Sequence, residues 1–186
     1  MSVTAESIKV ENVVASSDIG QELDLDTLSE DLQAADYNPD NFPGLVYRMS
    51  DPKAAALIFR SGKVVCTGAQ SVDGVKAALD YVFGELRKLG VEVDASPTVE
   101  IQNIVSSADL GQTLNLNAIA IGLGLEKIEY EPEQFPGLVY RLDDPEVVAL
   151  LFGSGKLVIT GGKRLEDAEQ ALTAIEGRLQ DLGLLE

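Results

Sequence analysis

The sequence predicts an α+β protein in which one structural unit occurs twice. Three observations support this class. A long segment recurs at a fixed offset of 93 residues. Each copy of this segment ends in apolar residues at three-four spacing, which is typical of an amphipathic helix. The residues between form short apolar or alternating runs bounded by Gly, Pro, Asn and Asp, which is typical of strands.

The repeat covers most of the chain. The heptapeptide Phe42–Arg48 recurs as Phe135–Arg141, and residues 37–90 and 130–183 are identical at 26 of 54 aligned positions. Nearer the N-terminus the offset is 91, since Asn12 matches Asn103, so a length change of two residues falls before Tyr37. We therefore predict two repeats, residues 1–93 and 94–186, related by pseudo-twofold symmetry.

In chain order, each copy is predicted to contain a strand, a short helix, four strands and a long helix. Gly90 marks the end of the first long helix, and Ser61-Gly62 is typical of a hairpin tip. The Asn38–Asn41 and Asp51-Pro52 segments supply turn residues. The expected strands cover 8–15, 35–38, 45–49, 54–59 and 63–67; the expected helices cover 25–31, 72–89, 116–121 and 165–182.

Both faces of the predicted sheet are largely apolar. Val64 and Cys66 alternate with Val65 and Thr67, and the first pair is expected to pack on the long helix. A sheet covered on one side only normally alternates apolar with polar residues. The second face is therefore either buried by another element or a binding surface. Its residues are Asn12, Val14, Val46, Leu57, Phe59, Val65 and Thr67, and their copies are Asn103, Val105, Val139, Leu150, Phe152, Val158 and Thr160.

The composition limits which partners the chain can bind and which reactions it can catalyse. The chain has 14 Lys and Arg against 31 Asp and Glu, a net charge of -17, which by itself disfavours a nucleic-acid partner. It has no histidine and a single cysteine, Cys66, which excludes Ser-His and Cys-His nucleophile pairs, imidazole metal ligands and an internal disulfide. We therefore expect no enzymatic activity, no cofactor and no metal, and a reducing cytoplasm.

The acidic residues are dispersed from Glu6 to Glu186 and the chain has only eight lysines. Such acidity is typical either of a surface that binds basic partners or of a protein that works in a cytoplasm of molar salt. Because the acidic residues are dispersed along the chain rather than gathered in a tail, the second explanation is favoured. Residues Met1–Ser7 show no export signal, and no stretch reaches the roughly 18 apolar residues of a membrane span. We expect a soluble intracellular protein.

Four duplicated motifs carry a specific resemblance. They are Asn12-Val13-Val14 and Asn103-Ile104-Val105, the two Phe-Pro-Gly-Leu-Val-Tyr-Arg segments, Leu-Ile-Phe and Leu-Leu-Phe before Ser-Gly-Lys, and Val-Cys-Thr-Gly with Val-Ile-Thr-Gly. From about residue 8 to 185 the chain resembles the TATA-box-binding proteins in their archaeal form. The resemblance implies a saddle in which ten antiparallel strands form one curved sheet, with four helices on its convex side. The concave face would bind the DNA minor groove, bend the DNA and act in transcription initiation.

The resemblance also assigns roles to residues of the second face. Asn12 and Asn103 would donate to base acceptors at the centre of the site, beside Thr67 and Thr160. In the minor groove A·T pairs offer only hydrogen-bond acceptors, whereas G·C pairs add a donor. Small apolar side chains are therefore compatible with A·T pairs and disfavour G·C pairs. The valines at 14, 65, 105 and 158 would contact the groove floor. Phe42 with Phe59 and Phe135 with Phe152 would wedge between base steps, and the phosphate contacts would be Arg48, Ser61, Lys63, Arg141, Ser154 and Lys156.

Partners follow from the same resemblance. Glu131 and Glu133 match acidic positions that contact transcription factor B, and the first copy has Asn38 and Asp40 there. This asymmetry would let the factor choose one end of the saddle, in a complex that recruits RNA polymerase. A homodimer of the free protein is left open. The expected location is the cytoplasm, associated with the nucleoid.

The sequence departs from the family on its long helices. Relatives usually carry basic residues there, but this chain has acidic ones, including Asp73, Asp80, Glu166 and Glu169, which predicts a halophilic source. A mesophile with an acidic interaction surface remains the alternative.

The sequence also leaves competing functions open. Gly153–Lys156 suggests a nucleotide loop but lacks its full glycine spacing and the following Ser or Thr. Two other functions compete with DNA binding. One is a module that encloses an apolar pocket for a small molecule, and the other is a scaffold that binds only proteins and holds basic partners on its acidic surface.

Overall fold

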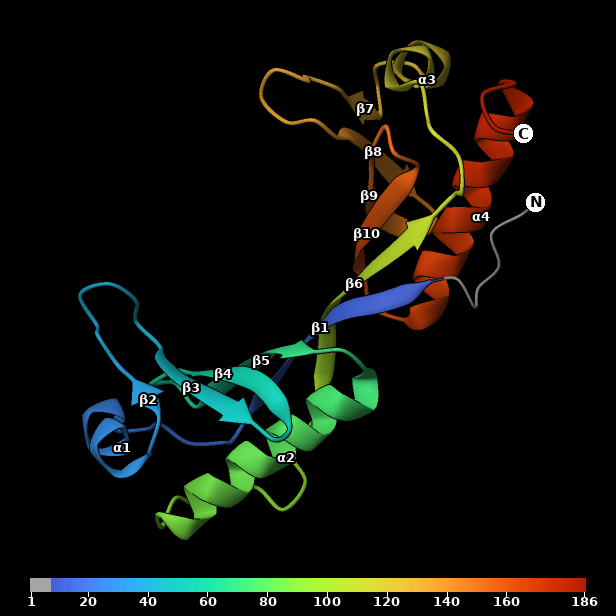
Figure 1. Ribbon diagram of the computed structural model, residues 1–186. Coiled ribbons are helices and arrows are strands. Elements are labelled where there is room, and N and C mark those ends of the chain that lie inside the picture. Colours follow the sequence, from blue (N-terminus) through green and yellow to red (C-terminus); the bar gives the residue numbers. More distant parts are fainter. Residues whose placement is uncertain (1–7) are drawn as a thin grey trace. The chain divides into compact units, whose positions relative to one another are not determined.

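The computed structural model describes residues 8–186, so the expectation that Met1–Ser7 is not an export signal lies outside the described residues. By internal contacts the chain divides into two units, residues 12–102 and residues 103–186 together with the segment up to Glu11. The described strands, ten in all, belong to one sheet in the order β2-β3-β4-β5-β1-β6-β10-β9-β8-β7 (Figure 1). The predicted boundary between residues 93 and 94 stays a prediction.

Each repeat contributes five strands and two helices to the described chain, and Figure 1 shows the same element order in both. The first repeat contains β1 (Lys9–Asp18), α1 (Leu25–Asp31), β2 (Ala35–Asp36), β3 (Leu45–Ser50), β4 (Lys53–Ile58), β5 (Lys63–Ala69) and α2 (Val72–Lys88). The second contains β6 (Glu100–Asp109), α3 (Leu116–Leu123), β7 (Ile128–Glu129), β8 (Leu138–Asp143), β9 (Glu146–Leu151), β10 (Lys156–Gly162) and α4 (Leu165–Asp181). The predicted α+β class with two repeats, ten antiparallel strands and four helices is confirmed for these residues.

The boundaries differ from prediction in a few places. Strand β1 continues to Asp18 rather than ending at Ala15, because it pairs with β5 as far as the Asp18–Lys63 pair. Strand β4 ends at Ile58, so Phe59 lies just beyond the ladder. The helix expected over residues 116–121 continues to Leu123, one residue longer than α1. The connection that follows it is also one residue longer, which accounts for the change of offset from 91 to 93.

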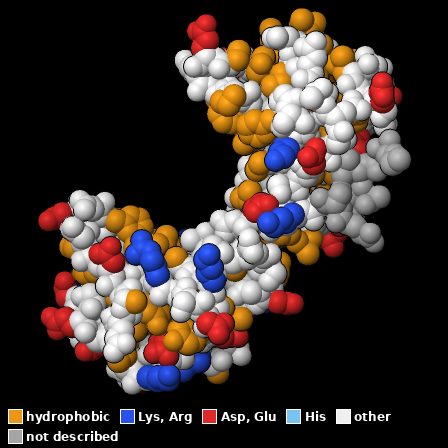
Figure 2. All heavy atoms as spheres, viewed as in Figure 1, with side chains coloured by type: hydrophobic (Ala, Val, Ile, Leu, Met, Phe, Trp, Pro, Cys, Tyr) orange, Lys and Arg blue, Asp and Glu red, His pale blue; other side chains and the backbone are white. Residues whose placement is uncertain are grey.

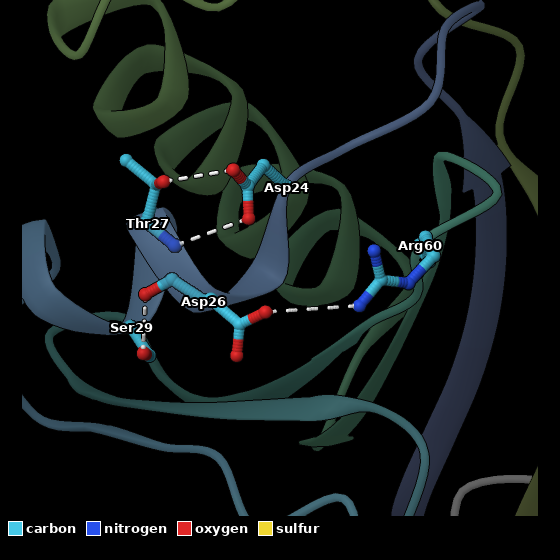
Figure 3. A network of polar contacts seen from close by, with 5 residues as sticks. All are labelled: Asp24, Asp26, Thr27, Ser29 and Arg60. Carbon is cyan, nitrogen blue, oxygen red and sulfur yellow. Dashed lines mark hydrogen bonds and ion pairs between the residues drawn. The ribbon is translucent and has the colours of Figure 1, made fainter.

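The helices begin at polar residues that satisfy free backbone N–H groups. Ser71 Oγ accepts a hydrogen bond from Gly74 N at 2.8 Å at the start of α2. Asp24 accepts from both the backbone N and the hydroxyl of Thr27 at the start of α1 (Figure 3). The first turn of α1 is also joined to the β4–β5 turn, since Asp26 Oδ2 lies 4.0 Å from Arg60 Nη2 (Figure 3).

The long helices cover one face of each set of strands. Helix α2 packs on β4 and β5, and Ile58, Val64 and Cys66 beneath it are completely buried, as their alternation predicted. Burial raises the pKa of the Cys66 thiol to about 11. Helix α4 packs on β9 and β10 in the same way, with Leu172, Ile175 and Leu179 in its core. The core of each repeat therefore lies between its long helix and one face of its strands.

Among residues 8–186, none of the helices combines the length and apolar character needed to cross a membrane.

Candidate nucleic-acid interface

The face opposite the long helix is apolar and partly accessible in the first repeat. We call it the first open face; its predicted residues are Asn12, Val14, Val46, Leu57, Phe59, Val65 and Thr67, all of them half-buried. Strand pairing aligns them in rows. Val46 pairs with Leu57 and Leu57 with Val65, whereas Arg48 pairs with Ala55 and Ala55 with Thr67.

The second repeat builds the same surface. The second open face consists of Asn103, Val105, Val139, Leu150, Phe152, Val158 and Thr160, again all half-buried. Val139 pairs with Leu150 and Leu150 with Val158. Figure 2 shows hydrophobic side chains reaching the surface in both units. Within each repeat, every predicted face residue therefore lies on one side of the strands, opposite the core.

An asparagine is held in a fixed orientation on each open face. Asn12 Oδ1 accepts a hydrogen bond from Gly68 N at 2.7 Å, and Asn12 Nδ2 donates to Thr67 Oγ1 at 3.1 Å. Asn103 repeats these contacts with Gly161 N at 2.6 Å and Thr160 Oγ1 at 3.1 Å. Because the backbone N–H is always a donor, the amide oxygen must face the glycine. Within residues 8–186 the second Nδ2 hydrogen of each asparagine has no acceptor, so it is available to an external one.

Glycines at irregular points of the ladder make this contact possible. The β1–β5 register shifts between Val13 and Ala15, and the β10–β6 register shifts between Ile159 and Gly162. Gly68 and Gly161 lie at these points with φ of +95° and +99°, a conformation that disfavours residues with a Cβ. The irregularity turns their N–H groups toward the asparagines.

Two phenylalanine pairs lie at the outer ends of strands. The Phe42 and Phe59 rings are edge to face with centroids 5.9 Å apart, and Phe135 and Phe152 have the same separation. Phe42 and Phe135 are 38% and 39% exposed, high values for large apolar rings. Each pair closes over the glycine of its Phe-Pro-Gly motif, because a Cβ on Gly44 would lie 2.8 Å from Phe42 and 2.9 Å from Phe59.

Polar and cationic residues surround the apolar rows. Arg48, Lys63, Arg141 and Lys156 are exposed, as are Ser61 and Ser154. Gly153–Lys156 forms the turn between β9 and β10, not the connection from a strand to a helix that a nucleotide loop requires. The alternative nucleotide-loop interpretation is therefore wrong. A hollow of about 450 Å³ lies beside this turn, lined among others by Phe152, Lys156 and Val158.

The acidic loop precedes the second phenylalanine pair. Glu131 and Glu133 are exposed, and the Glu131 carbonyl accepts hydrogen bonds from Gln134 N and Phe135 N at 3.0 and 2.9 Å. The Asn38 carbonyl accepts the corresponding bonds in the first repeat, both at 3.0 Å. The two loops thus share a backbone turn and differ in side-chain charge.

Two further residues belong to these faces and were not predicted from the sequence. Ala55 and Val148 are half-buried and pair with Thr67 and Thr160. Alternation within each strand could have found them, because Ala55 is two residues before Leu57 and Val148 two before Leu150.

The comparisons with known proteins agree with this geometry. The family described as "Transcription factor TFIID (or TATA-binding protein, TBP)" matches residues 7–89 and 98–182. TATA-box-binding protein B of Halobacterium salinarum is 69% identical over 186 residues, which is all of both chains. The TATA-box-binding protein of Haloarcula marismortui is 71% identical over 97% of each chain. These relatives confirm the predicted halophilic archaeal resemblance.

A solved structure supports the same assignment. Methanococcus jannaschii TBP aligns with a TM-score of 0.84 and 52% identity, covering 94% of this chain and 99% of that one. Both repeats match the family independently, and both carry the asparagine and phenylalanine arrangements described above. The chain therefore belongs to the family of TATA-box-binding transcription factors.

Proposed function

We propose that this chain binds the minor groove of TATA-like promoter DNA with its two open faces and bends the duplex by inserting its phenylalanine pairs. The observation that supports this most is the duplicated asparagine, whose amide is held by a backbone N–H on one side and offers a free donor on the other. Minor-groove edges of A·T pairs present only acceptors, in either orientation. One fixed donor in each repeat is suited to such bases.

The apolar rows supply selection against G·C pairs. The guanine amino group is a donor in the minor groove, and no acceptor on Val14, Val65 or Leu57 could receive it. Burying that donor against a valine would leave it without a partner, which costs about 1–3 kcal/mol. The rows thus favour A·T without a hydrogen bond that distinguishes A from T.

The phenylalanine pairs support the bending step. Each pair lies beyond the strand ends, with one ring exposed (Phe42 or Phe135) and the other half-buried, and neither belongs to the buried core, so no core rearrangement is needed for insertion. Unstacking a base step costs a few kcal/mol, and flexible TA steps lower that cost. We propose that this deformation contributes sequence preference where no base edge is read.

Partner binding is proposed at the second acidic loop. Glu131 and Glu133 would contact transcription factor B, and the complex would recruit RNA polymerase for initiation in the nucleoid. The exposed carboxylates and the absence of one at Asn38 in the first repeat support a single oriented contact. Dimerisation of the free protein through its open faces is a further proposal, consistent with their partly accessible apolar side chains.

The test is a mobility-shift and bending experiment at high KCl, with a TATA-containing duplex and a scrambled duplex of equal composition. Wild type should prefer the first duplex, and energy transfer between dyes at its ends should report bending. Phe135→Ala with Phe152→Ala should lower bending and affinity together. Leu165→Ala, an exposed site on α4, is the matched control and should change neither. Equal binding to both duplexes, or full bending by the double variant, would contradict the proposal.

A further inference from the structure

The two repeats present their corresponding arginines in different surroundings. Arg48 on β3 and Arg141 on β8 occupy the same position in the repeat, in the rows that contain Thr67 and Thr160. Both are exposed. If the open faces bind DNA as proposed above, these arginines are placed to meet phosphates along the groove.

Arg141 is already engaged by a carboxylate of its own repeat. Its Nη2 lies 3.8 Å from Glu129 Oε2 on β7, and its backbone N donates to the Lys127 carbonyl at 2.9 Å. Lys127 in turn is ion-paired and hydrogen-bonded to Asp143, a contact that raises the Lys127 pKa. Four alternating charges, Lys127, Glu129, Arg141 and Asp143, thus form one cluster at this edge.

The first repeat lacks the cluster. The corresponding residues are Ala34, Asp36, Arg48 and Ser50, so only one carboxylate and one cation remain. Asp36 is one methylene shorter than Glu129, and within residues 8–186 Arg48 forms no ion pair or side-chain hydrogen bond with another residue. The Arg48 guanidinium is therefore free to bind an external anion.

One further exchange and a nearby hollow act in the same direction. Lys53 at the start of β4 corresponds to Glu146 at the start of β9, which replaces a cation by a carboxylate on the same face. A hollow of about 700 Å³ beside Arg141 is lined by Asp143, Glu146 and Asp167 as well as by Lys163. An anion approaching Arg141 thus meets several carboxylates.

We propose that Glu129 restrains Arg141 and weakens phosphate binding by the second repeat, so that Arg48 of the first repeat is the dominant phosphate anchor. This inference rests on the proposed function. A phosphate that binds Arg141 must share the guanidinium with the Glu129 carboxylate or displace it, and like charges at about 4 Å repel even in water. The effect is screened at high salt, since the Debye length is about 10 Å at 0.1 M and about 3 Å at 1 M.

The test measures affinity for the TATA duplex at two KCl concentrations with charge-neutralising variants. Glu129→Gln should tighten binding about three- to fivefold at the lower salt and less at the higher. Asp36→Asn, the matched change in the first repeat, should alter affinity less than twofold. Arg48→Ala should weaken binding about tenfold, and Arg141→Ala only about threefold.

A double-mutant cycle gives the decisive readout. In the Glu129→Gln background, Arg141→Ala should cost as much as Arg48→Ala, because the arginine has been released. Equal losses for the two arginines in the wild-type background, together with no effect of Glu129→Gln, would overturn the inference. Failure of the proposed function is distinguishable, since wild type would then bind TATA and scrambled duplexes equally. All substituted side chains are exposed, and thermal melting checks that each variant is folded.

Discussion

A single methyl group at Gly137 should weaken DNA bending without unfolding the protein. A Cβ at this position would lie 2.7 Å from Phe135 Cε1 and 2.9 Å from Phe152 Cε1, whereas ordinary contact begins near 3.4 Å. Gly137 does not have a left-handed φ, so Gly137→Ala adds no backbone strain. The added methyl group would instead collide with the Phe135 and Phe152 rings, which must move to accommodate it.

The magnitude follows from how far the rings must move. To reach ordinary contact they withdraw by about 0.5 to 0.7 Å, away from each other, which widens a pair whose centroids are now 5.9 Å apart. Stacking of an aromatic side chain on a base contributes about 1–3 kcal/mol. If the displaced wedge loses about half of this, affinity falls by about 1 kcal/mol, or roughly fivefold. The stability loss should be smaller, because Phe135 is 39% exposed and can move.

The assay is energy transfer between dyes at the ends of a TATA duplex, combined with thermal melting of the free protein. Gly137→Ala should reduce both the bend and the affinity, while its melting temperature stays within a few degrees of wild type. Gly177→Ala in α4 is the matched control. Its Cβ would meet nothing within 4 Å, so it should leave bending unchanged and stabilise the helix by about 0.5–1 kcal/mol. Wild-type bending by Gly137→Ala would refute the wedge assignment and the role of this glycine.

Two further predictions concern stability and salt. The Ser106 hydroxyl is buried on the core side of β6 and has no hydrogen-bond partner within residues 8–186, and Ala15 occupies its position in the first repeat. Ser106→Ala should therefore stabilise the protein by about 1 kcal/mol in chemical denaturation. A loss of stability would show that the hydroxyl has an essential partner. The chain has a net charge of -17, which high salt screens. Its affinity for the TATA duplex should therefore reach a plateau or rise between about 0.5 and 2 M KCl. The reason is that apolar burial, together with uptake of cations between carboxylates and DNA, replaces the neutralisation of phosphates by basic residues. A steady fall in titrations over this range would contradict the halophilic binding hypothesis.

Much of the local structure was predictable because it depends on neighbouring residues. The α2 apolar spacing from Val75 to Leu86 places one stripe on the strands, and the stripe is buried as expected. Alternation in β5 separated buried Val64 from half-buried Val65 without knowledge of its partners. Boundaries were less predictable, since β1 extends to Asp18 only because β5 pairs with it there.

The sequence by itself determined the duplication, the order of elements in each copy and which side of each strand faces the core. These features follow from helical and strand periodicity, which act over a few residues. Only the tertiary structure decided that Gly68 fixes the Asn12 amide, 56 residues away. It also decided that Glu129 on β7 engages Arg141 on β8, whereas Arg48 has no ion pair with any residue from 8 to 186. Such contacts depend on strand register and on side-chain length across neighbouring strands. Repeats that share a fold and build the same open face can therefore still differ in the charged contacts around that face.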